Sequence, residues 1–501
     1  MSASYRMLKL SFDTLSRTAS RQIPTNVIRS FSGSAYVFAK AAPKLKDGKK
    51  KAKQGFKNKG PESKTAKVKK GGMTHLKFKD AVRSLKFEKS ATDFSQLNIK
   101  DISYESLKSI TSTVVKYDDY TEKVLQDLDS FKKYQYHELF SKPVSMVSDN
   151  TLKLDEQFIS KLESPSKDNR LCLLGEKGVG KSVLLSQAKA LAISKYNKDV
   201  ILLHLDHPQK IVEGSSDYIY NKRIEKYQQP MFTKRWVKKL RASNEEIFKK
   251  LPLTRDISFT AKKKEYDLKK DENTLYEFLL YNHDFGKVGP TSAFNFLIEE
   301  IMHHSKKVPV LVSIDDFNTL TSETLTKYRH PDFEPIHFTE FEMGSFILKL
   351  ASGELSFAKG GVLLAESKDI SYGHTLPVGL GLEQYDPYYK QHQCDFDVAN
   401  SLLLNGGVSS MTVENLTKNQ CRELYNFWDA TGVLRVREYP SNEDYKTSEQ
   451  IADEQAAKKS GEEEEKYIYD PEEQFEKLVQ NNFTISSGNP GHLIKTTTLS
   501  Y

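Results

Sequence analysis

The sequence predicts an α/β fold in which helices flank a parallel β-sheet, and three observations lead to this class. Short apolar runs with the length of buried strands recur at residues 171–174, 199–205, 308–314 and 360–367. Apolar residues at helical spacing fill segments between these runs, such as 183–192 and 291–304. Because strands and helices alternate along the chain, right-handed crossovers can join the strands into one parallel sheet.

A glycine-rich loop follows the first of these strands and matches the pattern G-x-x-x-x-G-K-[ST] at residues 175–182. A strand before the loop and a helix after it are the context that a nucleotide-binding P-loop requires. Glycines let successive backbone N–H groups turn inward around phosphate oxygens, and the positive end of the following helix strengthens the attraction. The residues expected to bind nucleotide are Gly175, Lys177, Gly178, Val179, Gly180, Lys181, Ser182 and Val183.

Two acidic residues complete the predicted site. The Lys181 ammonium group would contact the outer phosphates, and the Ser182 hydroxyl would be one ligand of Mg²⁺. Asp315 ends the strand at 308–314, so its carboxylate is expected at the carboxyl edge of the sheet as the second Mg²⁺ ligand. Asp316 is the candidate catalytic acid. It is one methylene shorter than the Glu that many P-loop ATPases use to polarise water, so the sequence favours nucleotide binding over efficient hydrolysis.

Composition excludes several classes of protein. The chain of 501 residues is 38% apolar and 28% charged, and no uninterrupted apolar run approaches membrane-spanning length, so no membrane partner is expected. The three cysteines, Cys172, Cys394 and Cys421, form neither a C-x-x-C pair nor a Cys/His cluster. Their spacing argues against a disulfide framework or a zinc site and fits a reducing compartment.

The positive charge of the chain lies at its N-terminus. Residues 1–70 contain 18 Lys and Arg and 3 Asp and Glu. The positive charge of this segment is larger than the net charge of the whole chain, which is +8, so the rest of the chain is acidic. Residues 1–31 are rich in Arg and Ser, which is typical of a mitochondrial transit peptide and predicts a matrix protein; a plain basic N-terminus is the alternative. Residues 32–72 are expected to be a disordered basic tail, suited to RNA phosphates or serving only as a solubilising linker.

The remaining boundaries follow from changes in composition. We expect an N-terminal wrap at 73–165, a nucleotide-binding core at 166–375 and a C-terminal helical lid at 376–501. The lid should contain a helix over 413–431, with Thr412 as its N-cap, and an acidic insertion at 441–470.

The charged segment 221–270 has two open interpretations. Phe232, Trp236 and Phe248 lie among its clusters of Lys and Arg, a combination that is suited to RNA. Solvated faces of helices would give the same pattern.

The motifs, in their order and spacing, resemble the death-associated protein three family, the P-loop proteins of the mitochondrial ribosomal small subunit. The resemblance rests on residues 138–143 (ELFSKP), 174–182 (LGEKGVGKS), 202–208 (LLHLDHP), 312–318 (VSIDDFN) and 487–490 (SGNP). The insertions between these motifs suggest a fungal member.

This resemblance implies a P-loop NTPase core related to the AAA+ group, with a helical lid, in the head of the small subunit near the subunit interface. The implied partners are small-subunit rRNA, ribosomal proteins and, across an intersubunit bridge, large-subunit proteins. The implied cofactors are GTP or GDP with Mg²⁺. ATP stays open, because no N-K-x-D motif follows the acidic strand.

Three functions therefore compete. The first is a structural ribosomal protein that is stabilised by its bound nucleotide. The second is an active matrix P-loop NTPase that acts as an assembly or remodelling factor. The third is a soluble RNA-binding protein with a vestigial loop.

Overall fold

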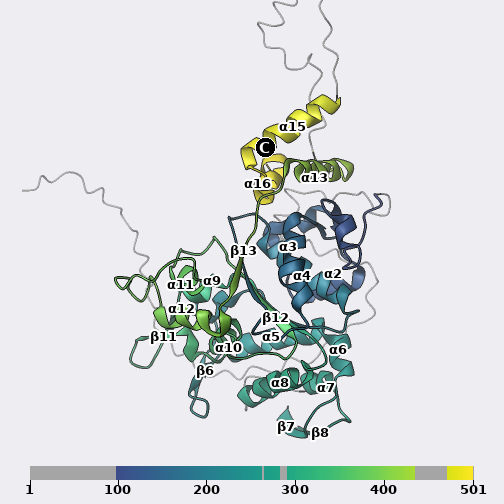
Figure 1. Cartoon of the computed structure of the whole chain (residues 1–501). Helices are drawn as coiled ribbons and strands as arrows, with labels where there is room; N and C mark the ends of the chain where they lie inside the picture. Colours follow the sequence, from purple (N-terminus) through teal and green to yellow (C-terminus); the bar gives the residue numbers. More distant parts are fainter. Residues whose placement is uncertain (1–96, 262–263, 282–289, 435–470, 500–501) are drawn as a thin grey trace, which may run out of the picture. The chain divides into compact units, whose positions relative to one another are not determined.

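The computed structural model describes residues 97–261, 264–281, 290–434 and 471–499 (Figure 1). These residues all fall within one compact unit, Leu76–Tyr501. The predicted transit peptide (1–31), basic tail (32–72), first part of the wrap and acidic insertion (441–470) lie outside the described residues.

A five-stranded parallel sheet forms the centre of the fold, with the strand order β13–β3–β12–β9–β4. The strands are β3 (Arg170–Leu174), β4 (Ile201–Leu205), β9 (Val310–Ile314), β12 (Gly360–Ala365) and β13 (Ser409–Thr412). Leu171 on β3 is paired with Leu363 on β12 and with Ser409 on β13, which fixes the register of the inner strands. The sheet and the helices around it confirm the predicted α/β class.

The strand order creates a switch point at β3. From β3 the chain passes through α4 (Lys181–Lys195) to the edge strand β4, and later it crosses from β12 to β13 on the other side of β3. Loops that leave neighbouring strands in opposite directions open a crevice at their carboxyl ends. The glycine-rich loop begins at this crevice, directly after β3.

Helix α4 is buried on nearly all sides, because it contacts both the sheet and the N-terminal segment. It packs against β9 and β12 and against α2 (Asp119–Asp127) and α3 (Asp149–Gln157), which lie beside it in Figure 1. An apolar helix of this kind cannot face water without a large loss of hydrophobic stabilisation. The described part of the N-terminal segment therefore belongs to the main core.

The other described helices are α5 (Pro230–Ser243), α6 (Glu245–Lys250), α7 (Leu275–Tyr281), α8 (Pro290–His304), α9 (Asn318–Ser322), α10 (Glu342–Ala351), α11 (Thr375–Gly379), α12 (Phe396–Leu403), α13 (Lys418–Ala430), α15 (Pro471–Ser486) and α16 (Pro490–Ile494). Four antiparallel strand pairs are β1 (Val114–Lys116) with β2 (Val144–Met146), β5 (Ile219–Asn221) with β6 (Lys226–Gln228), β7 (Ile257–Ala261) with β8 (Lys264–Leu268), and β10 (Leu325–Arg329) with β11 (Pro335–His337). No described helix is both long and apolar enough to cross a membrane.

A second, smaller core joins the C-terminal helices to the N-terminal segment. Tyr425 and Trp428 on α13 are buried together with Val479 on α15 and Leu493 after the start of α16. Phe140, which precedes β2, packs on the same cluster, with its ring 5.2 Å from that of Phe427. The two ends of the described chain thus stabilise one another.

The prediction of a helix over 413–431 is wrong about where the helix begins. Residues 409–412 form the edge strand β13, so Thr412 ends a strand and does not cap a helix. The cap is Thr417, whose Oγ1 accepts from the Gln420 N–H at 3.3 Å while the Gln420 side chain accepts from the Thr417 N–H at 3.1 Å. The sequence does not predict this strand, because only Met411 is buried in it and its residues form no apolar run.

The three aromatic residues that suggested RNA binding in segment 221–270 are buried and not available to RNA. Phe232 and Trp236 lie on the buried face of α5, and Phe248 is fully buried on α6. The Trp236 N–H donates to the His204 carbonyl at 2.8 Å, which fixes α5 against β4. The spacing that suggested interleaved aromatic and basic residues is the ordinary spacing of amphipathic helices.

Candidate functional site

The phosphate loop adopts the conformation that its glycines allow. Gly175, Gly178 and Gly180 have φ angles of 141°, 89° and 102°, a region that residues with a Cβ rarely enter. Gly180 is the N-cap of α4, so the loop runs directly into the positive end of that helix. The residues predicted to bind phosphate are therefore brought together between β3 and α4.

The Lys181 side chain folds back into the curve of this loop. Its Nζ donates to the carbonyl oxygens of Gly175 at 2.7 Å and Glu176 at 2.6 Å, and the residue is only 8% exposed. Burial lowers the pKa of Lys181, and the nearby Glu366 carboxylate opposes this effect. The backbone of the loop itself therefore holds the Lys181 ammonium group.

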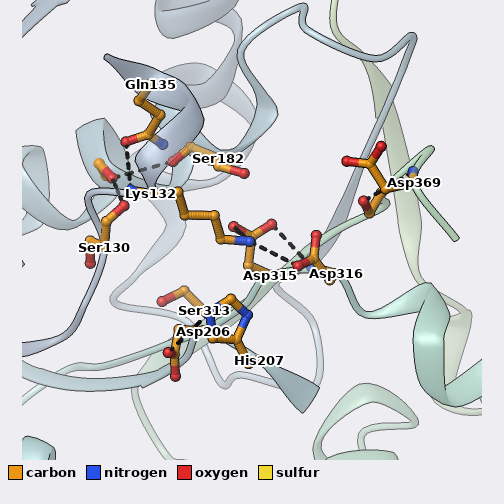
Figure 2. Close-up of polar contacts among 12 residues, drawn as sticks. Ser130, Lys132, Gln135, Ser182, Asp206, His207, Ser313, Asp315, Asp316 and Asp369 are labelled. Atoms are coloured by element: carbon orange, nitrogen blue, oxygen red, sulfur yellow. Dashed lines mark hydrogen bonds and ion pairs between the residues drawn. The ribbon is translucent and has the colours of Figure 1, made fainter. Parts of the chain in front are cut away.

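The two predicted acidic residues lie together at the end of β9, and a lysine joins them. The Lys132 Nζ lies 2.7 Å from Asp315 Oδ2 and 2.9 Å from Asp316 Oδ2 (Figure 2). Burial disfavours the charged amine, but the two carboxylates outweigh this effect and raise the pKa of Lys132. The other Asp315 oxygen accepts from the Asp316 N–H at 3.0 Å.

Sequence reasoning missed Lys132 because nothing around it forms a motif. It lies in the irregular connection between α2 and a short 3₁₀ helix, Lys133–Gln135. Only the folded chain places this connection against the first turn of α4. There Ser186 donates to the carbonyl oxygens of Ser182 at 3.2 Å and Ser130 at 3.4 Å.

The C-terminal motif at 487–491 holds the outer side of the phosphate loop. The Asn489 Nδ2 donates to the Lys177 carbonyl at 2.9 Å, and the Gly491 N–H donates to the Gly178 carbonyl at 3.0 Å. The same Asn489 caps α16, because its Oδ1 accepts from the Gly491 N–H at 3.1 Å and the His492 N–H at 3.4 Å. The two glycines of this motif, Gly488 and Gly491, are the sequence signal that could have indicated a tight backbone contact.

Residues that follow β9 and β12 form another side of the site. The Asn318 side chain donates to the Ser367 carbonyl at 2.7 Å and accepts from the Ser367 N–H at 2.8 Å. Lys177 in the loop forms an ion pair with Asp369, which follows β12. These contacts connect the segments that follow β9 and β12 to each other and to the phosphate loop.

The basic side chains of α5 face a mixed environment. Arg235, Lys238 and Lys239 line a cavity of about 440 Å³ beside β4 that also contains Asp129 and Asp206. Lys239 is paired with both of these acids, at 2.7 Å and 2.9 Å. The lining of this cavity is therefore not uniformly basic.

A family profile described as "Mitochondrial ribosomal death-associated protein 3" matches residues 145–496 of the chain. The small ribosomal subunit protein mS29 of Schizosaccharomyces pombe is 24% identical over 288 residues, which cover 55% of this chain and 56% of that relative. The chain thus spans about half the length of that curated relative. The family match confirms the predicted resemblance and the predicted mitochondrial location. The chain belongs to the mitochondrial ribosomal death-associated protein 3 family.

Proposed function

We propose that this protein is a structural component of the mitochondrial small ribosomal subunit, where it supports translation, and that it binds a purine nucleotide as a mainly structural ligand. Membership in the family supports the first part. One observation carries the second part: a complete G-x-x-x-x-G-K-S loop connects β3 to the N-terminus of α4 at the switch point of a parallel sheet. In this proposal the sheet is a P-loop NTPase core of AAA+ type.

The nucleotide proposed for this site is GTP or GDP, and ATP is not excluded. The loop amides and Lys181 would hold its phosphates. The Mg²⁺ predicted with it would neutralise phosphate charge, with Ser182 and Asp315 as its protein ligands. To reach Asp315, however, the metal would have to displace the Lys132 ammonium group.

The proposed partners are small-subunit rRNA and ribosomal proteins in the head of the subunit, with large-subunit proteins reached across an intersubunit bridge. Sedimentation of mitochondrial lysates through a sucrose gradient at high salt tests this part. We expect the chain to migrate with the small subunit. A position at the top of the gradient would contradict the structural role.

Nucleotide binding is tested on the purified chain with GTP, GDP and ATP. A ligand that binds only the folded state at 100 times its Kd stabilises that state by about 2.7 kcal/mol. We expect the melting temperature to rise with nucleotide in the wild type and not in Lys181→Ala. Lys198→Ala removes an exposed lysine beyond the end of α4 and should behave as the wild type. Unchanged melting of the wild type would refute nucleotide binding.

An active matrix NTPase is the alternative, and it needs Asp316 as the activating acid. The ion pair between Asp316 and Lys132 disfavours it, because the Asp316 oxygen that contacts the ammonium group is already engaged and faces Lys132 rather than a water molecule. Multiple-turnover hydrolysis that disappears in Asp316→Ala would establish the alternative.

A further inference from the structure

We propose that Lys132 is the built-in cation of the acidic pair, so that this protein binds its nucleotide without requiring Mg²⁺. The inference rests on the nucleotide binding proposed above and adds to it how the charge of the site is balanced. P-loop proteins ordinarily leave this balance to a metal ion.

The geometry at the acidic pair supports the inference directly. The Lys132 ammonium group contacts one oxygen of Asp315 at 2.7 Å and one of Asp316 at 2.9 Å, as Figure 2 shows. The second Asp315 oxygen is bonded to the Asp316 amide. Both oxygens of the predicted metal ligand therefore have partners within the chain.

Exchange of this ammonium group for a metal ion would be costly. The side chains are 18% exposed for Lys132, 5% for Asp315 and 17% for Asp316, so the three charges sit largely out of water. A buried lysine that loses its carboxylates keeps its charge and its desolvation penalty. Mg²⁺ also demands near-octahedral oxygen ligands and gives up its water reluctantly, which makes an already bonded carboxylate a poor site for it.

Lys132 is held in place by its own neighbours. Its backbone N–H donates to the Gln135 side chain at 3.1 Å, and the Ser130 N–H donates to the Leu125 carbonyl at 2.9 Å. The ring of Phe131 packs edge-on against His137 at 4.8 Å between centroids. These contacts fix the backbone from which the Lys132 side chain extends to the acidic pair.

The ammonium group can also serve the ligand. It carries three N–H donors and accepts none, and two of these donors point to Asp315 and Asp316. Among the described residues the third donor has no partner, so it can donate to an anion. A lysine thus supplies positive charge beside the phosphate loop and cannot coordinate a metal.

The test measures the Kd of GDP for the full chain by calorimetry, once with Mg²⁺ and once with excess EDTA. We expect the two wild-type values to agree within about threefold, a difference below 1 kcal/mol. Lys132→Met keeps the volume of the side chain without its charge, so its Kd should weaken at least about tenfold in EDTA relative to Mg²⁺. Lys132→Arg should restore the wild-type behaviour. Lys142→Met is the matched control, because Lys142 lies in the same segment, pairs with Asp119 and has a side chain that is 43% exposed.

The outcomes separate this inference from the proposed function. Wild-type protein that binds GDP in Mg²⁺ but at least tenfold more weakly in EDTA would overturn the inference and leave nucleotide binding intact. Wild-type protein that binds no nucleotide in either buffer would overturn both. If Lys132→Met does not fold, the wild-type comparison decides. Melting without nucleotide gives a second readout: we expect no shift on adding Mg²⁺, and a rise of several degrees would contradict the role of Lys132.

Discussion

Gly178 and Gly491 meet backbone to backbone at the phosphate loop. A Cβ atom on Gly491 would lie 2.8 Å from the Gly178 Cα, and the Gly491 N–H donates to the Gly178 carbonyl at 3.0 Å. Residues that lie far apart in the sequence therefore shape one site. The consequence is that the packing of α15 and α16 and the shape of the loop depend on each other.

The first prediction concerns the close approach at Gly178. A Cβ there would lie 2.6 Å from Asn489 Oδ1, whereas at Gly406, which has nearly the same φ angle, it would meet nothing within 4 Å. Gly406→Ala should cost about 1 kcal/mol for the backbone conformation alone. Gly178→Ala adds the steric conflict and should cost about 2–4 kcal/mol. Urea unfolding of both variants measures the difference, and equal losses would show that the C-terminal motif does not rest on the loop.

The second prediction concerns the cap at Asn489, which is 1% exposed. Asn489→Ala removes the α16 cap and the hydrogen bond to the Lys177 carbonyl, so it should cost about 1–2 kcal/mol and weaken nucleotide binding. Thr417→Ala removes the cap of α13, which makes no contact of this kind with the loop, and should cost about 1 kcal/mol. Calorimetric titration with GDP would contradict the coupling if both variants bound like the wild type.

The third prediction concerns Lys189, a buried lysine on α4 whose Nζ has no hydrogen-bond partner within the described part of the chain. Burial lowers its pKa to about 7, whereas an unfolded chain has a lysine pKa of about 10.4. Between these values the unfolded state binds more protons, so the stability should rise with pH from about 7 to about 10. Lys189→Met should flatten this rise and stabilise the protein at neutral pH.

Urea unfolding between pH 6 and pH 9.5, in steps of roughly half a pH unit, measures how the stability depends on pH. Lys198→Met provides the exposed control. A slope in Lys189→Met as steep as that of the control would assign the pH dependence to other groups.

Much of the core was predictable because burial leaves a strong trace in sequence. The inner strands are apolar runs, and Asp315 follows one of them, so the P-loop and the acidic pair could be placed on the same sheet edge. Strand β13 left no such trace, because it pairs along one side only and buries Met411 alone.

The part of the site that could not be predicted comes from distant segments. Lys132 reaches the site because its segment packs on the main core, and Asn489 reaches it through the second core. No spacing along the chain encodes either contact. Phe232 and Trp236 left two interpretations open, because aromatic residues between lysines fit both an RNA-binding surface and the buried face of an ordinary helix.

The most direct measurement is the nucleotide content of mitochondrial small subunits purified at high salt. After denaturation, chromatography of the released nucleotides gives the amount of GTP, GDP or ATP for each copy of this chain. We expect roughly one purine nucleotide per copy in the wild type and its loss in Lys181→Ala, because that ammonium group holds the phosphates. Particles that contain the wild-type chain and release no nucleotide, or that release the same amount with Lys181→Ala, would contradict the proposed role of the loop.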